Sequence, residues 1–203
     1  MTTFSGQVAT GNDDAHEADN SSGFNASAVT MRCEASTAAG SRWNCAFRID
    51  NVSVPPGVII TNAYASVVFP VGQRDSPDLD WYLNDIDDAA DFATEADVTS
   101  RAKTSPSVAW NDTDLGSSSF VDGPDISALV QAVVDRGGWA QNNAMVVIAE
   151  GQNTTAQEDG CRFTPYDSVT SDACKLTIEY EMGRGPRILK PKAGYIPVHQ
   201  LQL

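Results

Sequence analysis

Histidine and basic residues are scarce in this 203-residue chain, and apolar residues never form a long run. Lys and Arg number 13 against 27 Asp and Glu, which gives a net charge of −14. Because nucleic-acid binding relies on Lys and Arg, this balance argues against a nucleic-acid partner. No window approaches the roughly 18 apolar residues of a membrane span. The first residues also lack a basic region followed by an apolar one, so we expect neither a membrane partner nor a secretory signal.

The two histidines, His16 and His199, limit the catalytic chemistry that the chain can support. A nucleophilic triad needs a histidine in the body of the fold. His16 lies in an acidic stretch, however, and His199 lies near the C-terminus. The many acidic residues are compatible with a pair of carboxylates for glycoside hydrolysis. Their number alone, however, does not point to any particular pair. We therefore expect no catalytic residues and a protein that is not an enzyme.

The four cysteines form two local pairs, Cys33 with Cys45 and Cys161 with Cys174. Neither pair has the CxxC spacing typical of zinc sites. We predict two local disulfides, each closing a loop of about a dozen residues; buried free thiols are the alternative. Disulfides without a secretory signal indicate a protein that is made in a cytoplasm and serves outside it. A virus particle released by lysis fits that description.

Most of the chain consists of short apolar segments separated by turn residues, a pattern typical of strands in a β-sandwich. The exception is residues 124–139, where Ile126, Leu129, Val130 and Val133 follow the i, i+3, i+4, i+7 spacing of a helix face. We expect this face to cover one end of a β core. The predicted strands are residues 4–11, 27–34, 43–50, 58–69, 80–86, 98–101, 107–110, 143–149, 161–163 and 175–181.

Two groups of side chains are candidates for ligand binding. Asp13, Asp14 and Glu17 lie in an acidic stretch and offer the hard oxygen ligands that calcium favours. The full EF-hand spacing is missing, so a solvated acidic turn is the stronger interpretation; no other metal or cofactor is expected. Trp81 and Tyr82 offer aromatic faces on which sugars could stack. Strand alternation would bury one of the pair, which makes core packing the alternative.

Several segments, taken in order, resemble a family of β-sandwich domains found in bacterial surface and secreted proteins and in tailed phages. The resemblance covers roughly residues 4–182 and implies a jelly-roll-like sandwich similar to carbohydrate-binding modules, an accessory or display domain without catalytic residues. The cysteine pairs and the segment after Met182 lie outside the family pattern. The matching segments are DDAHE (13–17), FRIDNV (47–52), PG (56–57), ITNAY (60–64), SR (100–101), VAW (108–110), the helix at 124–139 and LTIEY (176–180).

Residues 183–203 differ from the rest of the chain in charge, since they contain four basic residues and no acid. Three prolines in this stretch favour an extended chain over a long helix. We therefore divide the chain into a β-sandwich domain, 1–182, and an extended C-terminal arm, 183–203, that binds a neighbouring protein. Folding back onto the acidic body is the alternative. The arm residues predicted to bind the partner are Arg184, Arg187, Ile188, Leu189, Lys190, Lys192, Tyr195, Ile196, Val198, Leu201 and Leu203.

These patterns predict a structural virion protein of a tailed phage, either a capsid decoration or cement protein or a tail-associated component. Its expected partners are other virion proteins and further copies of itself, and its expected location is the virion. The alternative function is a carbohydrate-binding adhesion module that recognises cell-surface glycans through Trp81 and Tyr82.

Overall fold

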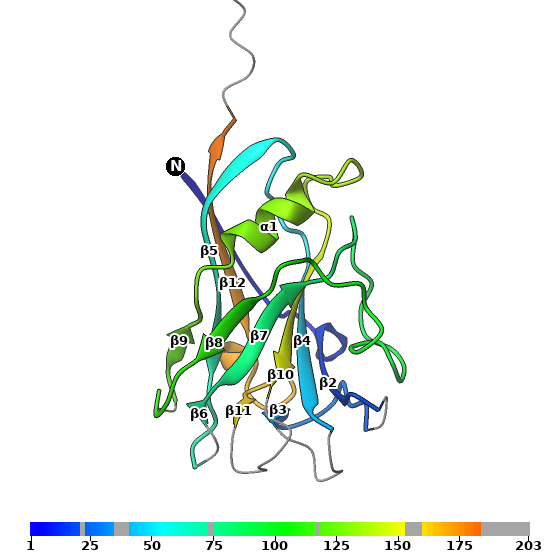
Figure 1. Ribbon diagram of the computed structural model, residues 1–203, viewed down its shortest axis with the longest axis vertical. Coiled ribbons are helices and arrows are strands. Elements are labelled where there is room, and N and C mark those ends of the chain that lie inside the picture. The colour runs from blue at the N-terminus through cyan, green and yellow to red at the C-terminus, as the bar shows by residue number, and fades with distance from the viewer. Residues whose placement is uncertain (21–22, 35–40, 73–74, 117, 153–159, 184–203) are drawn as a thin grey trace, which may run out of the picture.

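The computed structural model describes residues 1–20, 23–34, 41–72, 75–116, 118–152 and 160–183, which form a β-sandwich (Figure 1). Three antiparallel sheets and one α-helix make up this part of the chain, so the predicted all-β class with one short helix is confirmed. No helix in the described segments has the length and apolar character needed to cross a membrane. Gly183 is the last described residue, and the rest of the predicted arm lies outside the described residues.

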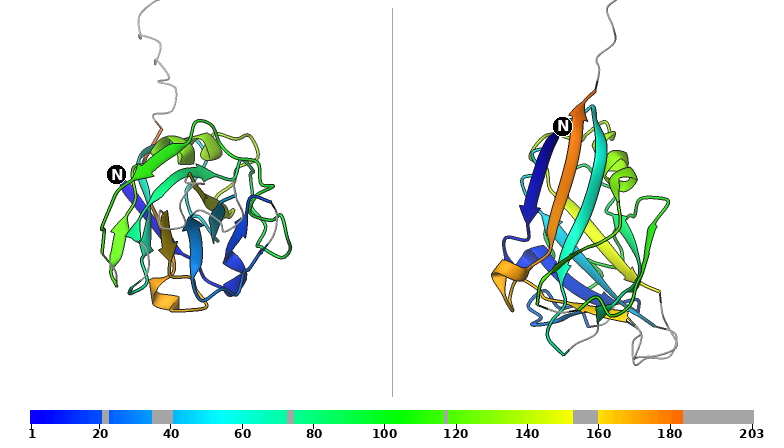
Figure 2. Two further views of the ribbon diagram at one scale, coloured as in Figure 1. Left: turned by 60° about the horizontal axis from the view of Figure 1, so that its bottom comes forward. Right: turned by 90° about the vertical axis from the view of Figure 1, so that its left-hand side faces the viewer.

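Two larger sheets face each other across the core (Figure 2). The first sheet has the order β1 (Thr2–Gln7), β12 (Lys175–Met182), β5 (Val58–Val68) and β9 (Phe120–Asp122). The second has the order β2 (Asp14–Ala18), β4 (Trp43–Ile49), β10 (Met145–Gly151), β7 (Asp78–Leu83) and β8 (Val108–Asn111). The first and last strands of the described segments, β1 and β12, therefore lie side by side.

A third, smaller sheet closes one end of the sandwich (Figure 1). It consists of β3 (Met31–Glu34), β11 (Gly160–Phe163) and β6 (Asp75–Ser76), and two 3-10 turns, η1 (Gly11–Asp13) and η2 (Thr170–Asp172), complete the elements. We call this end the distal pole. The opposite end, where β12 finishes at Met182, is the exit pole.

Aromatic side chains from the second and third sheets meet at the centre of the core with Phe69, which directly follows β5 of the first sheet. The Trp81 ring lies nearly parallel to those of Trp110 and Phe163, with centroids 5.9 and 6.3 Å away. Phe47 and Phe69 pack at an angle against the same group. Such pairs add roughly 0.5–1.5 kcal/mol each beyond the area that they bury. This cluster joins the two facing sheets to the small sheet at the distal pole.

The second sheet is buried on its outer face as well. Phe92 and Val98 of the segment between β7 and β8 pack against Ala46, Val146 and Ile148. A strand covered on both sides needs apolar residues at every position instead of at alternate ones. This explains why β10 reads in the sequence as a continuous apolar run.

The helix α1 (Ser127–Val134) packs against β5 and β7, near the exit pole. All four residues of the predicted apolar face are buried: Ile126, Leu129, Val130 and Val133. The opposite face also contributes, because the Gln131 amide accepts a hydrogen bond from the Ile60 N–H at 2.8 Å and donates to the Val58 carbonyl at 3.1 Å. Gln131 thereby ties the helix to an edge of β5 that no other described strand covers at these positions.

Two local predictions are wrong. The acidic stretch expected as a loop contains β2, which pairs with β4 through the whole length of Asp14–Ala18. Residues 98–101, expected as a strand, form turns instead. Here the Arg101 guanidinium donates to the carbonyl oxygens of Ala90, Asp91 and Asp97 and so closes the segment on itself. Strand pairing with β4 decides the first segment and side-chain hydrogen bonds of Arg101 decide the second, and hydrophobic periodicity records neither.

Candidate functional site

The predicted sugar platform is not available at Trp81, whose side chain is only 1% exposed and belongs to the core cluster. Tyr82, the next residue of β7, points to the other face of the sheet, where it is half-buried and lies beneath the Lys103 ammonium at 5.5 Å. The two rings therefore face opposite sides of one sheet and form no common surface. The alternative interpretation, in which strand alternation buries one ring of the pair in the core, is correct.

The three carboxylates proposed for calcium do not converge. Asp13 pairs with Arg48 at 2.7 Å and accepts from the Thr10 hydroxyl. Asp14 accepts from the Tyr166 N–H at 2.8 Å, and Glu17 is fully buried against a different loop. Within the described residues, no group of three or more His, Cys, Asp or Glu side chains is arranged to hold a metal ion. In this structure Asp13, Asp14 and Glu17 therefore do not form a common calcium site.

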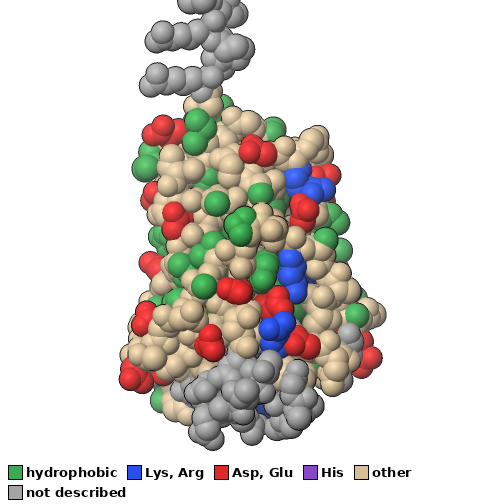
Figure 3. Space-filling view, viewed as in Figure 1, with side chains coloured by type: hydrophobic (Ala, Val, Ile, Leu, Met, Phe, Trp, Pro, Cys, Tyr) green, Lys and Arg blue, Asp and Glu red, His purple; other side chains and the backbone are tan. Residues whose placement is uncertain are grey.

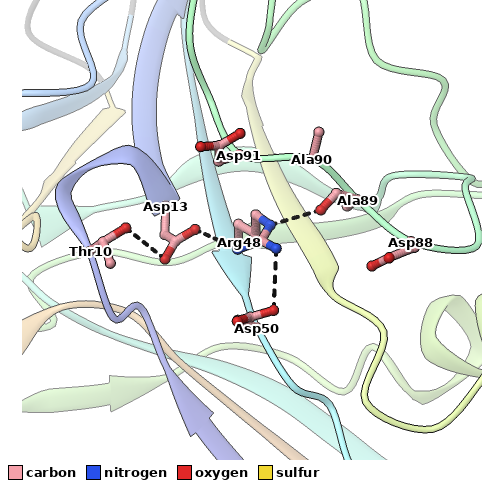
Figure 4. Close-up of a pocket in the computed structure, with 8 residues that line it drawn as sticks. All are labelled: Thr10, Asp13, Arg48, Asp50, Asp88, Ala89, Ala90 and Asp91. Atoms are coloured by element: carbon pink, nitrogen blue, oxygen red, sulfur yellow. Dashed lines mark hydrogen bonds and ion pairs between the residues drawn. The ribbon is translucent and has the colours of Figure 1, made fainter.

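Asp13 instead lines a polar pocket of about 530 Å³ centred on Arg48 (Figure 4). The guanidinium donates to Asp13 at 2.7 Å, to Asp50 at 3.2 Å and to the Ala89 carbonyl at 2.7 Å. Arg48 is thus fully engaged by protein oxygens and joins η1, β4 and the segment after β7. Arg48 therefore holds these segments together. Of the two other acids that line the pocket, neither is joined to Arg48 (Figure 4), and Asp88 accepts a hydrogen bond from the Ala144 N–H at 2.8 Å.

The cysteines are all buried and free, so neither predicted disulfide is present. Cys33 and Cys161 lie directly opposite each other on β3 and β11, and the Cys33 thiol is within hydrogen-bonding reach of both Cys161 and Cys45. Cys174, the partner predicted for Cys161, stands apart from this group at the start of β12. The strands that carry Cys33 and Cys45, β3 and β4, belong to different sheets. Burial raises the pKa of the Cys174 thiol well above its ordinary value.

A second pocket, of about 480 Å³, lies at the distal pole; we call it the distal pocket. Its aromatic side chain, Trp43 at the start of β4, is half-buried, with the His16 ring edge-on at 5.0 Å. The Arg32 guanidinium lies over the indole at 5.5 Å, and Arg162 stands opposite Arg32 in the register of β3 and β11. The lining residues are His16, Gly23, Asn25, Ala28, Val29, Thr30, Arg32, Trp43 and Arg162.

The distal pocket combines fixed donors with an aromatic surface. The Arg162 guanidinium is held by two hydrogen bonds to Glu34, at 3.1 and 2.9 Å. The Nδ1 atom of His16 accepts from the Arg32 N–H at 3.1 Å, so the imidazole proton lies on Nε2. Burial and then the Arg32 charge lower the pKa of His16 to about 4, which keeps the ring neutral at physiological pH. Cations, a neutral N–H donor and an indole are the groups that recognise polar, ring-shaped ligands.

The pKa values of Asp14 and His16, two residues apart on β2, are shifted in opposite directions. Burial raises the pKa of Asp14 to about 7, partly offset by the hydrogen bond from Tyr166, while the charges of Asp167 and Asp13 raise it further. The folded protein therefore binds a proton at Asp14 that the unfolded chain releases near pH 4. This contribution to stability is fully present below pH 4 and is lost as the pH rises through about 7. His16 behaves oppositely, since its contribution is lost as the pH falls from about 6.5 toward 4.

We expect Asp14→Asn to be more stable than the wild type at pH 8, by up to about 3 kcal/mol, and equally stable at pH 4. The asparagine keeps an acceptor for the Tyr166 N–H but has no charge to bury. Urea unfolding of both proteins at several pH values measures the difference. Asp172, half-buried on η2, supplies the control Asp172→Asn, which should show no such trend. A constant difference between the Asp14→Asn variant and the wild type from pH 4 to 8 would contradict the assignment.

The sequence interpretation missed Trp43, Arg32 and Arg162, although the sequence contains a signal for two of them. The dipeptides Arg32-Cys33 and Cys161-Arg162 are mirror images. Mirror-image dipeptides that pair in an antiparallel ladder place like residues opposite each other, here both cysteines inward and both arginines outward. The predicted partner-binding residues of the arm, from Arg184 onward, lie outside the described residues.

No family model matches this chain, and no curated protein matches it. The resemblance to β-sandwich domains of surface proteins and tailed phages therefore rests on the ordered sequence segments.

Proposed function

We propose that this protein is a structural component of a tailed-phage particle, a β-sandwich mounted on the particle surface as a capsid decoration or as a tail-associated part. In this proposal the C-terminal arm attaches the domain to other virion proteins or to further copies of the chain. Two things support it: the ordered resemblance of residues 4–182 and the character of the exit pole.

The exit pole carries exposed apolar side chains, and this observation supports the proposal most strongly. Met182 is 70% exposed, Met1 is 77% exposed and Ile59 is 54% exposed. The strand register places Ile59 beside Glu181 on one face of the sheet and Met182 beside Val58 on the other, while Met1 directly precedes β1, so exposed apolar side chains occupy both faces at this end of the sheet. Figure 3 shows hydrophobic side chains at this pole. Exposed apolar groups gathered at one place mark an interaction surface more often than isolated ones do.

The charge distribution adds to this. Residues 183–203 have four basic residues and no acid in a chain whose net charge is −14. A basic, intermittently apolar segment that starts beside an apolar patch can extend that patch onto a neighbour, with main-chain hydrogen bonds to a sheet edge providing affinity. Opposite charges favour association of one copy's arm with the acidic body of another copy or of a different acidic protein.

Truncation after Gly183 tests the attachment. We expect the shortened protein to unfold cooperatively at nearly the wild-type temperature, because β12 and its partners remain complete. It should fail, however, to co-sediment with particles or to form the oligomers of the full chain. A full-length variant with Ile59→Ser and Met182→Ser should be weakened in assembly without losing its fold. Loss of the fold on truncation, or assembly that continues unchanged, would refute attachment through the arm.

A further inference from the structure

Arg32 differs from the other arginines of the described chain in its partners. No carboxylate or carbonyl oxygen of the described residues accepts a hydrogen bond from its guanidinium, whose contact is the indole of Trp43. An arginine without an oxygen partner is unusual here, because the protein has a large excess of acids. The other described arginines all donate to protein oxygens: Arg42, Arg48, Arg101, Arg136 and Arg162.

The surroundings hold this guanidinium at the distal pocket. The Arg32 main chain is fixed on both sides, by its pairing with Arg162 and by the hydrogen bond from its N–H to His16. The nearby carboxylate of Glu34 is already engaged by Arg162 in a two-bond pair. Arg32 therefore has its five donors available at a pocket that it lines together with an indole.

We propose that the distal pocket binds a sugar that carries a carboxylate, such as a uronic acid or sialic acid residue of a cell-surface polysaccharide. The planar guanidinium of Arg32 matches a carboxylate with two parallel hydrogen bonds. The partly exposed indole of Trp43 packs against the C–H groups of the sugar ring. The neutral imidazole of His16 donates from Nε2 to a hydroxyl group.

The charge of the whole molecule favours a carboxylate sugar over a highly charged anion. The acidic body repels anions in general, so a sugar residue with a single carboxylate is repelled less than an anion with several charges. The pocket's volume, about 480 Å³, lies within the range of roughly 300–1,000 Å³ that is usual for small-ligand sites. The strands that carry Arg32 and Arg162, β3 and β11, lie at the pole opposite the exit pole (Figure 1). The inference does not depend on mounting through the arm.

Calorimetric titration of the full chain with defined sugars tests the site. The acidic probes are trigalacturonate and sialyllactose, which distinguish a uronic acid from a sialic acid source. The neutral controls are the methyl ester of trigalacturonate and lactose. We expect at least one acidic probe to bind, and its neutral counterpart to bind at least about tenfold more weakly, because the charge-assisted pair is lost.

The variant Arg32→Ala should reduce binding of the acidic probe at least about tenfold, and Arg32→Lys should restore only part of it, because lysine lacks the fork of donors. The matched control Arg136→Ala removes an arginine near the exit pole, paired with Asp85 and Asp87, and should bind like the wild type. Thermal unfolding confirms that each variant is folded. Absence of binding by both acidic probes, equal binding by the folded Arg32→Ala variant, or equal binding of inorganic phosphate would overturn the proposal. Since Arg32 lies on β3 at the distal pole and Met182, where β12 ends, lies at the exit pole, these outcomes are independent of the assembly test.

Discussion

Replacing Glu17 with glutamine should lower the free energy of unfolding by about 3–5 kcal/mol. Glu17 is completely buried, and its carboxylate accepts hydrogen bonds from three main-chain N–H groups and one hydroxyl. A glutamine would turn an NH₂ group toward some of these donors and leave them without an acceptor in a place that water does not reach. The donors are the N–H groups of Ala96, Val98 and Thr99 and the Thr99 hydroxyl.

The loss of stability should exceed the contribution of the hydrogen bonds alone. The loop that Glu17 holds carries Phe92 and Val98 over the outer face of the second sheet, so releasing it exposes the apolar cluster beneath. Urea unfolding measures the stability, and amide exchange in residues 92–99 should accelerate. Glu95, exposed in the same loop, provides the control Glu95→Gln, which should change stability by less than about 0.5 kcal/mol. Similar stabilities for the two variants would show that Glu17 does not hold the loop.

Replacing Trp81 with alanine should cost about 3–5 kcal/mol, the loss typical of deleting a large aromatic from a core. Trp81 lies between the rings of Trp110 and Phe163, so its removal leaves a cavity at the junction of the three sheets. Phenylalanine at this position should recover part of the stability, because a smaller ring still fills some of the space. Thermal and urea unfolding give the comparison.

The neighbouring residue supplies the matched control. Tyr82→Ala removes a half-buried ring from the outer face of β7 and should have a much smaller effect, about 1 kcal/mol. If Trp81 instead formed a surface for sugars, Trp81→Ala would leave stability nearly unchanged and reduce glycan binding. That result would contradict the core assignment.

The elements whose residues follow a simple period were predictable. The helix face at Ile126, Leu129, Val130 and Val133 and the alternation along β12 depend only on contacts between apolar groups, which periodicity records directly. The apolar run of β10 was also recognisable, although its two covered faces could not be inferred without knowing what packs on the outer side.

Polar residues with structural roles were not predictable in the same way. Asp14 and Glu17 have the composition of a solvated turn, yet both are buried because Tyr166 and the loop 96–99 supply donors from distant parts of the sequence. The distal pocket depends on a strand pairing between residues 31–34 and 160–163, a separation that a single sequence does not reveal. Cysteine spacing was misleading for the same reason, since the nearest thiols come from three different strands.

The orientation of β12 determines how the domain responds to mechanical force. The strand runs toward the exit pole with β1 on one side and β5 on the other, and its hydrogen bonds lie perpendicular to its length. A pull on its C-terminal end therefore acts in shear, so that the bonds along both ladders resist sliding together, from Thr2 to Gln7 on one side and from Val58 to Ser66 on the other. A sideways pull would instead peel the strand away pair by pair. The sandwich is thus built to withstand tension along its long axis and is weakest against forces across it.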